Sequence, residues 1–88
     1  MKQVLKFKLS NTGNVTELAL PLMSTILTVQ YQGDDLVLWA MCYDTERTEV
    51  RKIRLVCTGE ELHHQTDLEF IASVFKDGYV FHLFEEHN

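Results

Sequence analysis

Two stretches of alternating apolar and polar residues, joined by a short polar connector, place the strongest constraint on how this chain can fold. They run from Leu36 to Tyr43 (LVLWAMCY) and from Val50 to Cys57 (VRKIRLVC), and the connector reads DTERTE. Alternation with a period of two is typical of β-strands that bury one face. We therefore predict a β-hairpin over residues 36–57, with one face in the core and the other facing solvent or a partner.

The second face of this predicted hairpin mixes aromatic and basic side chains. Aromatic surfaces with nearby cations bind nucleobases and phosphates, and Trp, Tyr and Arg are enriched in the hot spots of protein interfaces. A two-residue turn at Gly33-Asp34 would add two polar side chains from the preceding strand at the rim. The candidate ligand-binding or partner-binding residues are Thr28, Gln30, Trp39, Met41, Tyr43, Lys52 and Arg54. The alternative is that this face packs against a second sheet, with the Lys and Arg side chains extending to its edge.

The N-terminal third of the chain also favours strands. Residues 3–9, 15–20 and 25–32 alternate apolar and polar side chains, and Pro21 ends the second segment because proline cannot donate to a sheet. The Gly33-Asp34 turn predicts six pairs between residues 25–32 and the strand that follows. They are Val29 with Leu38, Tyr31 with Leu36, Leu27 with Ala40, Thr28 with Trp39, Gln30 with Val37, and Ile26 with Met41.

Residues 67–76 fit two different secondary structures. The residues from Thr66 to Glu69 match a capping box, and Leu68, Ile71, Ala72 and Phe75 recur at helical spacing. The β-preferring residues in the same segment and the Asp77-Gly78 turn favour a hairpin instead. We prefer the hairpin, which would pair Val74 with Phe81, Ala72 with Leu83, Ile71 with Phe84, and Ser73 with His82.

These patterns predict one domain over residues 1–88, mainly β. We expect a small antiparallel sandwich or partly open barrel of six to seven strands, with at most one short helix near residues 60–76. Strands that are apolar on both faces must be covered twice, either by the same chain or by a second subunit. We therefore expect a homodimer or a higher oligomer.

Composition excludes several classes of function. The 88 residues carry eight basic and thirteen acidic side chains, a net charge of −5, which argues against binding to duplex DNA. The longest apolar run is far shorter than the roughly 20 residues of a membrane helix, and the N-terminus lacks the apolar segment of a signal peptide. We expect a soluble cytoplasmic protein in which Cys42 and Cys57 are reduced core residues.

No set of side chains predicts catalysis or a cofactor. Ser73 and His82 would face each other like a nucleophile and a base, but no acidic residue is placed to orient the imidazole, so we predict a cross-strand hydrogen bond. His63 and His64, with Glu60, Glu61 and Asp67, offer metal-binding side chains in a spacing that matches no known zinc pattern, so we predict an exposed loop. We expect no enzyme, no metal site and no cofactor.

Several motifs spread over nearly the whole chain are shared with a known family. They are Leu38-Trp39-Ala40, Lys52, Thr58-Gly59, Leu68-Glu69-Phe70-Ile71 and Val80-Phe81-His82-Leu83-Phe84-Glu85. With these motifs the chain resembles a family of small uncharacterised proteins encoded by tailed phages and prophages. It departs from the family pattern at Cys57, where the family has the first Gly of a turn. The resemblance implies a phage accessory protein in the host bacterial cytoplasm, and it implies no activity.

Three functions follow as expectations from these observations. The first is a non-enzymatic phage accessory protein that binds and inhibits a bacterial host factor, such as a component of antiviral defence. The second is a small-molecule sponge that sequesters a nucleotide signal between aromatic and basic side chains. The third is a structural component of the virion.

Overall fold

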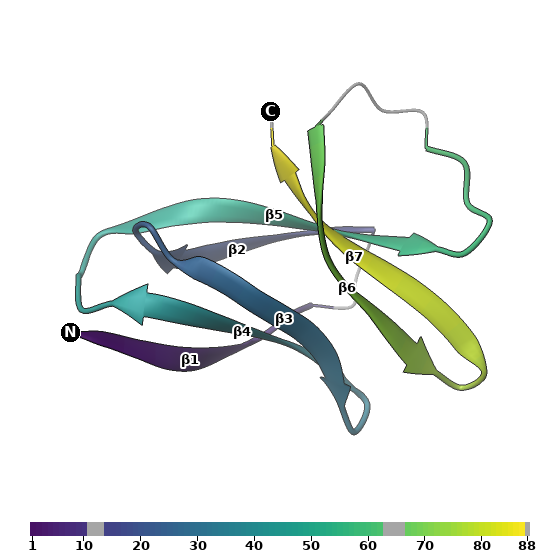
Figure 1. Ribbon diagram of the computed structural model, residues 1–88, viewed down its shortest axis with the longest axis horizontal. Coiled ribbons are helices and arrows are strands. Elements are labelled where there is room, and N and C mark those ends of the chain that lie inside the picture. The colour runs from purple at the N-terminus through teal and green to yellow at the C-terminus, as the bar shows by residue number, and fades with distance from the viewer. Residues whose placement is uncertain (11–13, 63–66, 88) are drawn as a thin grey trace.

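The alternating segments form seven antiparallel β-strands in two sheets that pack face to face as an open sandwich (Figure 1). The structure is a computed structural model, and it describes residues 1–10, 14–62 and 67–87, among which no helix occurs. The strands are β1 (Lys2–Lys8), β2 (Val15–Pro21), β3 (Thr25–Gln32), β4 (Asp35–Tyr43), β5 (Thr48–Cys57), β6 (Asp67–Lys76) and β7 (Tyr79–His87). The predicted mainly β sandwich is confirmed, and the helical alternative for residues 67–76 is wrong.

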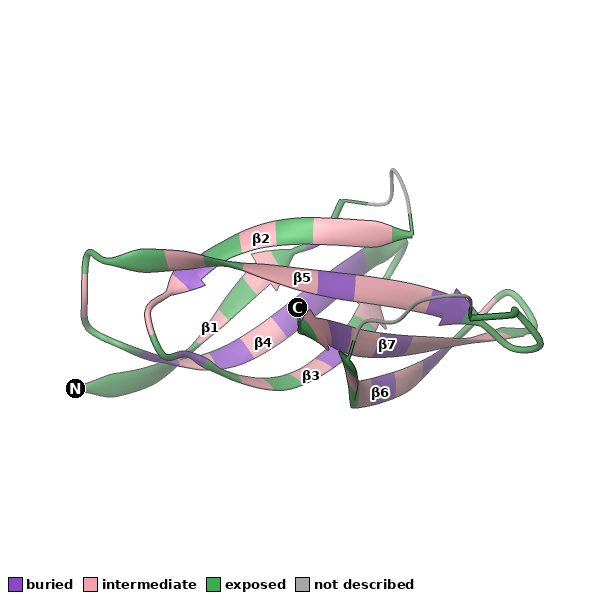
Figure 2. Cartoon of the chain, turned by 90° about the horizontal axis from the view of Figure 1, so that it is seen from above, coloured by how far each residue is buried: buried purple, intermediate pink, exposed green. Residues whose placement is uncertain are grey.

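The two sheets differ in size and enclose one apolar core. The first sheet has the strand order β1-β4-β3 and the second has the order β2-β5-β7-β6. The buried positions recur along the strands of both sheets, as the purple bands in Figure 2 show. The largest fully buried side chains belong to Leu20, Val29, Leu38, Cys42, Ile53, Val74 and Leu83. Every strand except β1 therefore contributes at least one fully buried side chain.

Two tight turns fold as their sequences predict. Gly33 has φ 65° between β3 and β4, where Gln32 pairs with Asp35. Asp77 and Gly78 have φ values of 52° and 83° between β6 and β7. Positive φ at both central residues is the two-residue geometry for which Asp-Gly is preferred, because glycine and aspartate tolerate the left-handed conformation. The predicted hairpins β3–β4 and β6–β7 are therefore confirmed.

Bulges change the predicted pairing at the far end of each hairpin. The pairs nearest the turns form as predicted, but the register shifts at Leu27 in β3 and at Ile71 in β6. Ile26 consequently pairs with Ala40, and Leu27 is 45% exposed. An extra residue in one strand reverses which side chains point inward beyond it. The predicted pairs Leu27 with Ala40, Ile26 with Met41, and Ile71 with Phe84 are therefore wrong.

The predicted hairpin over residues 36–57 does not form. β4 is the central strand of the first sheet, paired with β1 and β3, whereas β5 lies in the second sheet between β2 and β7. The connector at residues 44–47 carries the chain from one layer to the other. Two alternating strands with a short polar connector produce the same sequence pattern whether they pair as a hairpin or lie in two different sheets. The pairing of β4 with β1 decides between them, and it joins residues 29 to 41 positions apart.

The two cysteines occupy different environments. Cys42 is buried in the core, and Cys57 is exposed at the end of β5. Its carbonyl accepts a hydrogen bond from the backbone N–H of Glu60 (3.0 Å), and its own N–H donates to the Glu60 carboxylate (3.1 Å). Both cysteines are free thiols, but the prediction that Cys57 is a core residue is wrong, because Cys57 is the last residue of β5, before a turn, and is exposed.

Among the described residues there is no helix long and apolar enough to cross a membrane.

Candidate functional site

The outer face of the first sheet presents Trp39 at the centre of a mixed apolar and basic surface. Trp39 lies in register between Lys6 on β1 and Thr28 on β3, and Met41 lies in register with Val4. Residues directly opposite each other in antiparallel strands share a face. We call this surface the Trp39 face, and it consists of Lys2, Val4, Lys6, Lys8, Thr28, Gln30, Val37, Trp39, Met41 and Tyr43.

Apolar side chains on the Trp39 face remain accessible to solvent. Val4 is 52% exposed and Tyr43 is 46% exposed, and Trp39 and Met41 are half-buried. A half-buried Trp is held in place by its neighbours while still offering part of its ring to a partner. Trp residues in such positions are frequent hot spots in protein interfaces.

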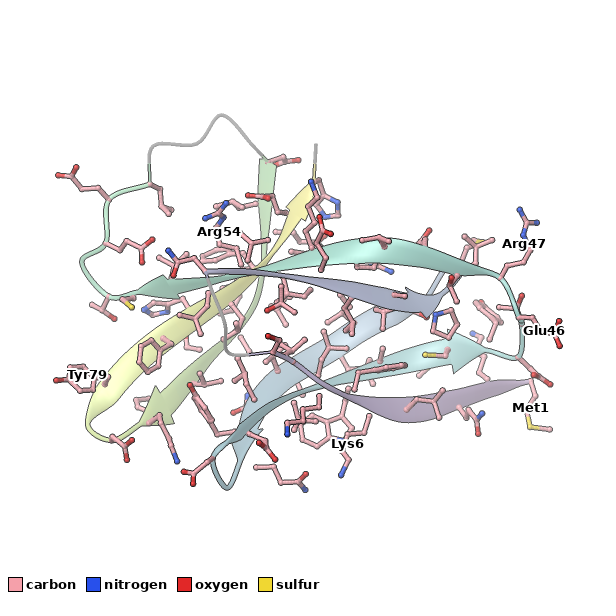
Figure 3. All side chains as sticks on the ribbon, turned by 180° about the vertical axis from the view of Figure 1, so that it is seen from behind. Met1, Lys6, Glu46, Arg47, Arg54 and Tyr79 are labelled. Carbon is pink, nitrogen blue, oxygen red and sulfur yellow. The ribbon has the colours of Figure 1, made fainter. Side chains whose placement is uncertain are left out.

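Lysine side chains from β1 cover part of the same face. Lys6 leaves β1 on the side away from the second sheet, as Figure 3 shows, and its Nζ donates to Gln32 Oε1 on β3 at 3.2 Å. Because β4 lies between β1 and β3, the aliphatic stem of Lys6 must cross β4 near Val37, which is buried. Lys2 places its Nζ 5.3 Å from the centre of the Tyr43 ring. The lysines thus combine apolar cover with positive charge around Trp39.

The structure separates two of the predicted site residues from the others. Lys52 and Arg54 lie on β5, in the other sheet, and Figure 3 shows Arg54 and Lys6 on opposite sides of the sandwich. Arg54 also forms an ion pair with Glu86, in which Nη2 lies 2.7 Å from Oε1, and its side chain is only 12% exposed. The prediction that both residues share a face with Trp39 is wrong, because it depended on pairing β4 with β5.

The other predicted site residues do lie on the Trp39 face, namely Thr28, Gln30, Met41 and Tyr43. The amide of Gln30 donates to the hydroxyl of Thr28 at 3.1 Å. The cation next to Trp39 is Lys6 rather than Lys52 or Arg54. The alternation of Lys6 and Lys8 with apolar residues identifies a solvent-facing strand. Only the pairing of β1 with β4 could have placed these lysines beside Trp39.

Comparison with known proteins places this two-sheet chain in a family. The model of a domain of unknown function, DUF7352, matches residues 1–88. The chain belongs to the DUF7352 family. Searches of curated proteins and of solved structures found no match for this DUF7352 chain.

A polar cluster around Arg51 connects the second sheet of the DUF7352 chain to the turn between β2 and β3. The guanidinium of Arg51 binds both carboxylate oxygens of Glu85, with Nη2 2.8 Å from Oε1 and Nε in contact with Oε2. Nη1 donates to the carbonyl of Ser24, in the turn between β2 and β3, at 2.8 Å, and to Glu49 at 3.2 Å. The hydrogen bonds to Glu85 raise the pKa of Arg51 above its usual value, although burial acts in the opposite direction. Arg51 therefore joins β5, β7 and the turn between β2 and β3, and we call this set of contacts the Arg51 clamp.

Three potential metal ligands lie beside this clamp. Single ligand atoms of Glu69, Glu85 and His87 all lie within 4.8 Å of one another. His87 Nε2, however, is 2.8 Å from Glu69 Oε1, and both oxygens of Glu85 are bound to Arg51. A cation would have to compete with a guanidinium for Glu85, so the geometry favours the ion pair. His63 and His64, the histidines for which an exposed loop was predicted, lie outside the described residues.

Ser73 and His82 face each other, and the predicted cross-strand hydrogen bond is confirmed. Ser73 Oγ lies 2.8 Å from His82 Nδ1, and Thr58 Oγ1 lies 2.9 Å from His82 Nε2. Because the Thr58 hydroxyl donates to the carbonyl of Val80, it accepts from Nε2–H, and Ser73 then donates to Nδ1. The third member of this hydrogen-bonded chain, Thr58, offers a hydroxyl rather than a carboxylate, which suits a structural network connecting β6 and β7 to the turn after β5.

Proposed function

We propose that this chain is a non-enzymatic binding protein that holds a partner protein on the Trp39 face. The observation that carries the proposal is the half-buried Trp39 between Lys6 and Thr28, next to the exposed Val4. An aromatic anchor, accessible apolar neighbours and surrounding polar side chains are the usual composition of a protein interface.

The class of partner follows from the resemblance to proteins of tailed phages and prophages. A phage accessory protein of this kind works in the bacterial cytoplasm, where it binds and inhibits a host factor, and an antiviral-defence component is the factor we propose. The His82 ring binds the hydroxyls of Ser73 and Thr58, an arrangement that supports a structural role for this pair. A structural role in the virion would predict instead that the protein co-purifies with phage particles.

Affinity capture from bacterial cells tests the proposal, with Trp39→Ala compared to Tyr79→Ala. Tyr79 is a matched control because it is an exposed aromatic residue on the other sheet, 68% exposed. For a purified captured partner, we expect Trp39→Ala to weaken the dissociation constant about 30-fold or more, as for a hot spot worth about 2 kcal/mol. Tyr79→Ala should change it less than about threefold. Loss of binding in Tyr79→Ala with full binding in a folded Trp39→Ala would overturn the assignment.

Inhibition requires a second readout in cells. A defended bacterial strain that expresses the protein should become sensitive to a phage that it otherwise resists. The Trp39→Ala variant should leave the strain resistant, although the variant accumulates to the same level and melts cooperatively. If the Trp39→Ala variant sensitises the strain as strongly as the unsubstituted protein does, the Trp39 face is not the inhibitory surface.

A small nucleotide is the second candidate ligand, because Lys6 lies beside Trp39 and an indole ring can stack a nucleobase while an ammonium group binds phosphate. Lys52 and Arg54 no longer support this alternative, since they lie on the other sheet. Native mass spectrometry of gently purified protein distinguishes the two candidates. A few hundred daltons of extra mass, with nucleobase absorbance, would favour the nucleotide, whereas tens of kilodaltons would favour a protein.

A further inference from the structure

β1 is an edge strand whose outward-facing backbone groups are ready to pair with another strand. The N–H of Leu9 donates to the carbonyl of Leu36 (2.8 Å), and the N–H of Asp44 donates to the carbonyl of Met1 (3.1 Å). These two bonds fix the phase of the ladder, so the odd-numbered residues of β1 face β4. The N–H and C=O groups of Lys2, Val4, Lys6 and Lys8 therefore point away from β4, along the free edge.

The two sides of the sandwich differ in how their edges meet. On one side, β3 packs beside β6, and Lys76 on β6 binds the β3–β4 turn through Asp34 Oδ1 (2.7 Å) and the carbonyl of Gly33 (3.1 Å). On the other side, β1 and β2 end their sheets without pairing with each other among the described residues. Leu5 and Phe7 on the inner face of β1 consequently remain half-buried at an open edge of the core.

The charge on β1 determines which strand could be added there. Lys2, Lys6 and Lys8 lie on the outer face of β1, in a chain whose net charge is −5. Of these three, Lys8 has an ion pair with Asp35, but both side chains are more than half exposed, 70% and 53%, so the pair is weak. Lys6 contacts the neutral amide of Gln32, and Lys2 contacts the Tyr43 ring. An incoming strand would therefore meet positive charge at alternate positions.

A second copy of the same strand fits this edge poorly. Antiparallel pairing of β1 with itself, centred on Leu5, would place Lys2 opposite Lys8 and Lys6 opposite Val4 of the other chain. Like charges directly opposite each other destabilise a sheet, and lysines on an edge strand commonly prevent self-association for this reason. The edge instead complements a strand with carboxylates at alternate positions.

We propose that β1 accepts an additional β-strand from an extended acidic segment of the partner. Asp or Glu side chains of that segment lie beside Lys2, Lys6 and Lys8, and the alternating apolar side chains pack beside Leu5 and Phe7. Main-chain hydrogen bonds provide affinity and the alternating side chains provide specificity, as in other cases of strand addition. This inference rests on the proposed partner-binding function and names how the partner is recognised.

The test uses the full chain and a capped synthetic peptide that alternates glutamate with valine over about nine residues, the length of a typical strand. We expect saturable binding that slows hydrogen exchange at the amides of Lys2, Val4, Lys6 and Lys8 about tenfold or more. The odd-numbered amides of β1 should change less, because they already face β4. A peptide alternating lysine with valine should not bind. Absence of binding by the glutamate peptide, or protection on β2 or β6 instead, would overturn the proposal.

Three variants test the mode of binding further. Val4→Pro removes an outward N–H without removing a bond to β4, so it should stay folded and lose the glutamate peptide. Lys6→Gln should weaken peptide binding about threefold to tenfold, whereas Lys52→Gln, with the same charge change on the other sheet, should have little effect. Unchanged peptide binding in a folded Val4→Pro would reject strand addition. If Trp39→Ala still abolished capture of the partner protein, the proposed function would survive that rejection.

Discussion

At the scale of single residues, the Arg51–Glu85 ion pair is a largely buried contact on which we expect the fold to depend. The Glu85 side chain is 8% exposed and the Arg51 side chain is 16% exposed, and Arg51 connects β5, β7 and the Ser24 turn. Glu85→Gln would leave the largely buried guanidinium with the more exposed Glu49 as its remaining ion-pair partner among the described residues. Breaking a buried ion pair by removing one partner costs about 3 to 5 kcal/mol.

We expect Glu85→Gln to lower the free energy of unfolding by about 3 kcal/mol, measured by urea denaturation. Glu46→Gln is the control, because Glu46 lies exposed in the connector between β4 and β5 and the charge change is identical. Glu46→Gln should change stability by less than about 0.5 kcal/mol. Equal stability of the two variants would show that Arg51 is not a clamp.

At the scale of elements, the β6–β7 hairpin depends on backbone conformation at its turn. Gly78 has φ 83°, and a Cβ added there would meet no atom within 4 Å, so any cost of substitution comes from the backbone. We expect Gly78→Ala to lower the free energy of unfolding by about 1 to 2 kcal/mol. Chemical synthesis with D-alanine at position 78 should restore stability, because a D-residue favours positive φ. If L-alanine and D-alanine gave equal stability, backbone strain would not explain the turn.

The elements also show which parts of the fold were predictable. Asp77-Gly78 and Gly33-Asp34 act locally, so the sequence alone located both hairpins and the pairs next to them. The bulges at Leu27 and Ile71 lack a Gly or Pro signal, and they shifted the pairs beyond them. The arrangement of β4 and β5 depended on pairing with β1, which no local pattern shows. The sequence pattern therefore placed Trp39 opposite Thr28, as the structure does, but it gave Trp39 the wrong basic neighbours.

At the scale of the whole molecule, the two sheets are also joined by an exposed ion pair between Asp34 and Lys76. The hydrogen bond from Lys76 lowers the pKa of Asp34 below its usual 3.8, and Asp34 raises the pKa of Lys76 above its usual 10.5. A lowered carboxylate pKa stabilises the fold above the unfolded-state value and loses this effect as the pH falls. A raised lysine pKa stabilises the fold below the unfolded-state value and loses this effect as the pH rises.

Asp34→Asn should therefore lower the melting temperature at about pH 7, and the difference from the unsubstituted chain should shrink below about pH 4. High salt should also reduce the difference at neutral pH, because exposed charges are screened. Thermal melts of both proteins across this range provide the measurement. A difference that stayed constant down to about pH 2 would mean that Asp34 acts through its turn rather than through its charge.

Exposed apolar side chains on the second sheet support the proposal that the chain forms oligomers. Val50 is 64% exposed, Phe70 is 59% exposed and Phe75 is 76% exposed. Because β1 is basic and disfavours self-pairing, we expect the second sheet to form the contact between copies. Native mass spectrometry should find twice the 10.2 kDa chain mass, or a higher multiple, and Phe75→Ser should reduce it. A monomer at every concentration tested would contradict this expectation.

The most direct test of the partner surface is hydrogen exchange of the whole chain, free and bound to a captured partner. We predict that binding slows exchange across residues 2–8, with the largest changes at Lys2, Val4, Lys6 and Lys8, and shields the Trp39 side chain from fluorescence quenching. The amides of β6 and β7 should exchange as they do in the free protein. Protection confined to residues 67–87, with Trp39 still accessible to quencher, would contradict the account, because the partner would then bind the other sheet.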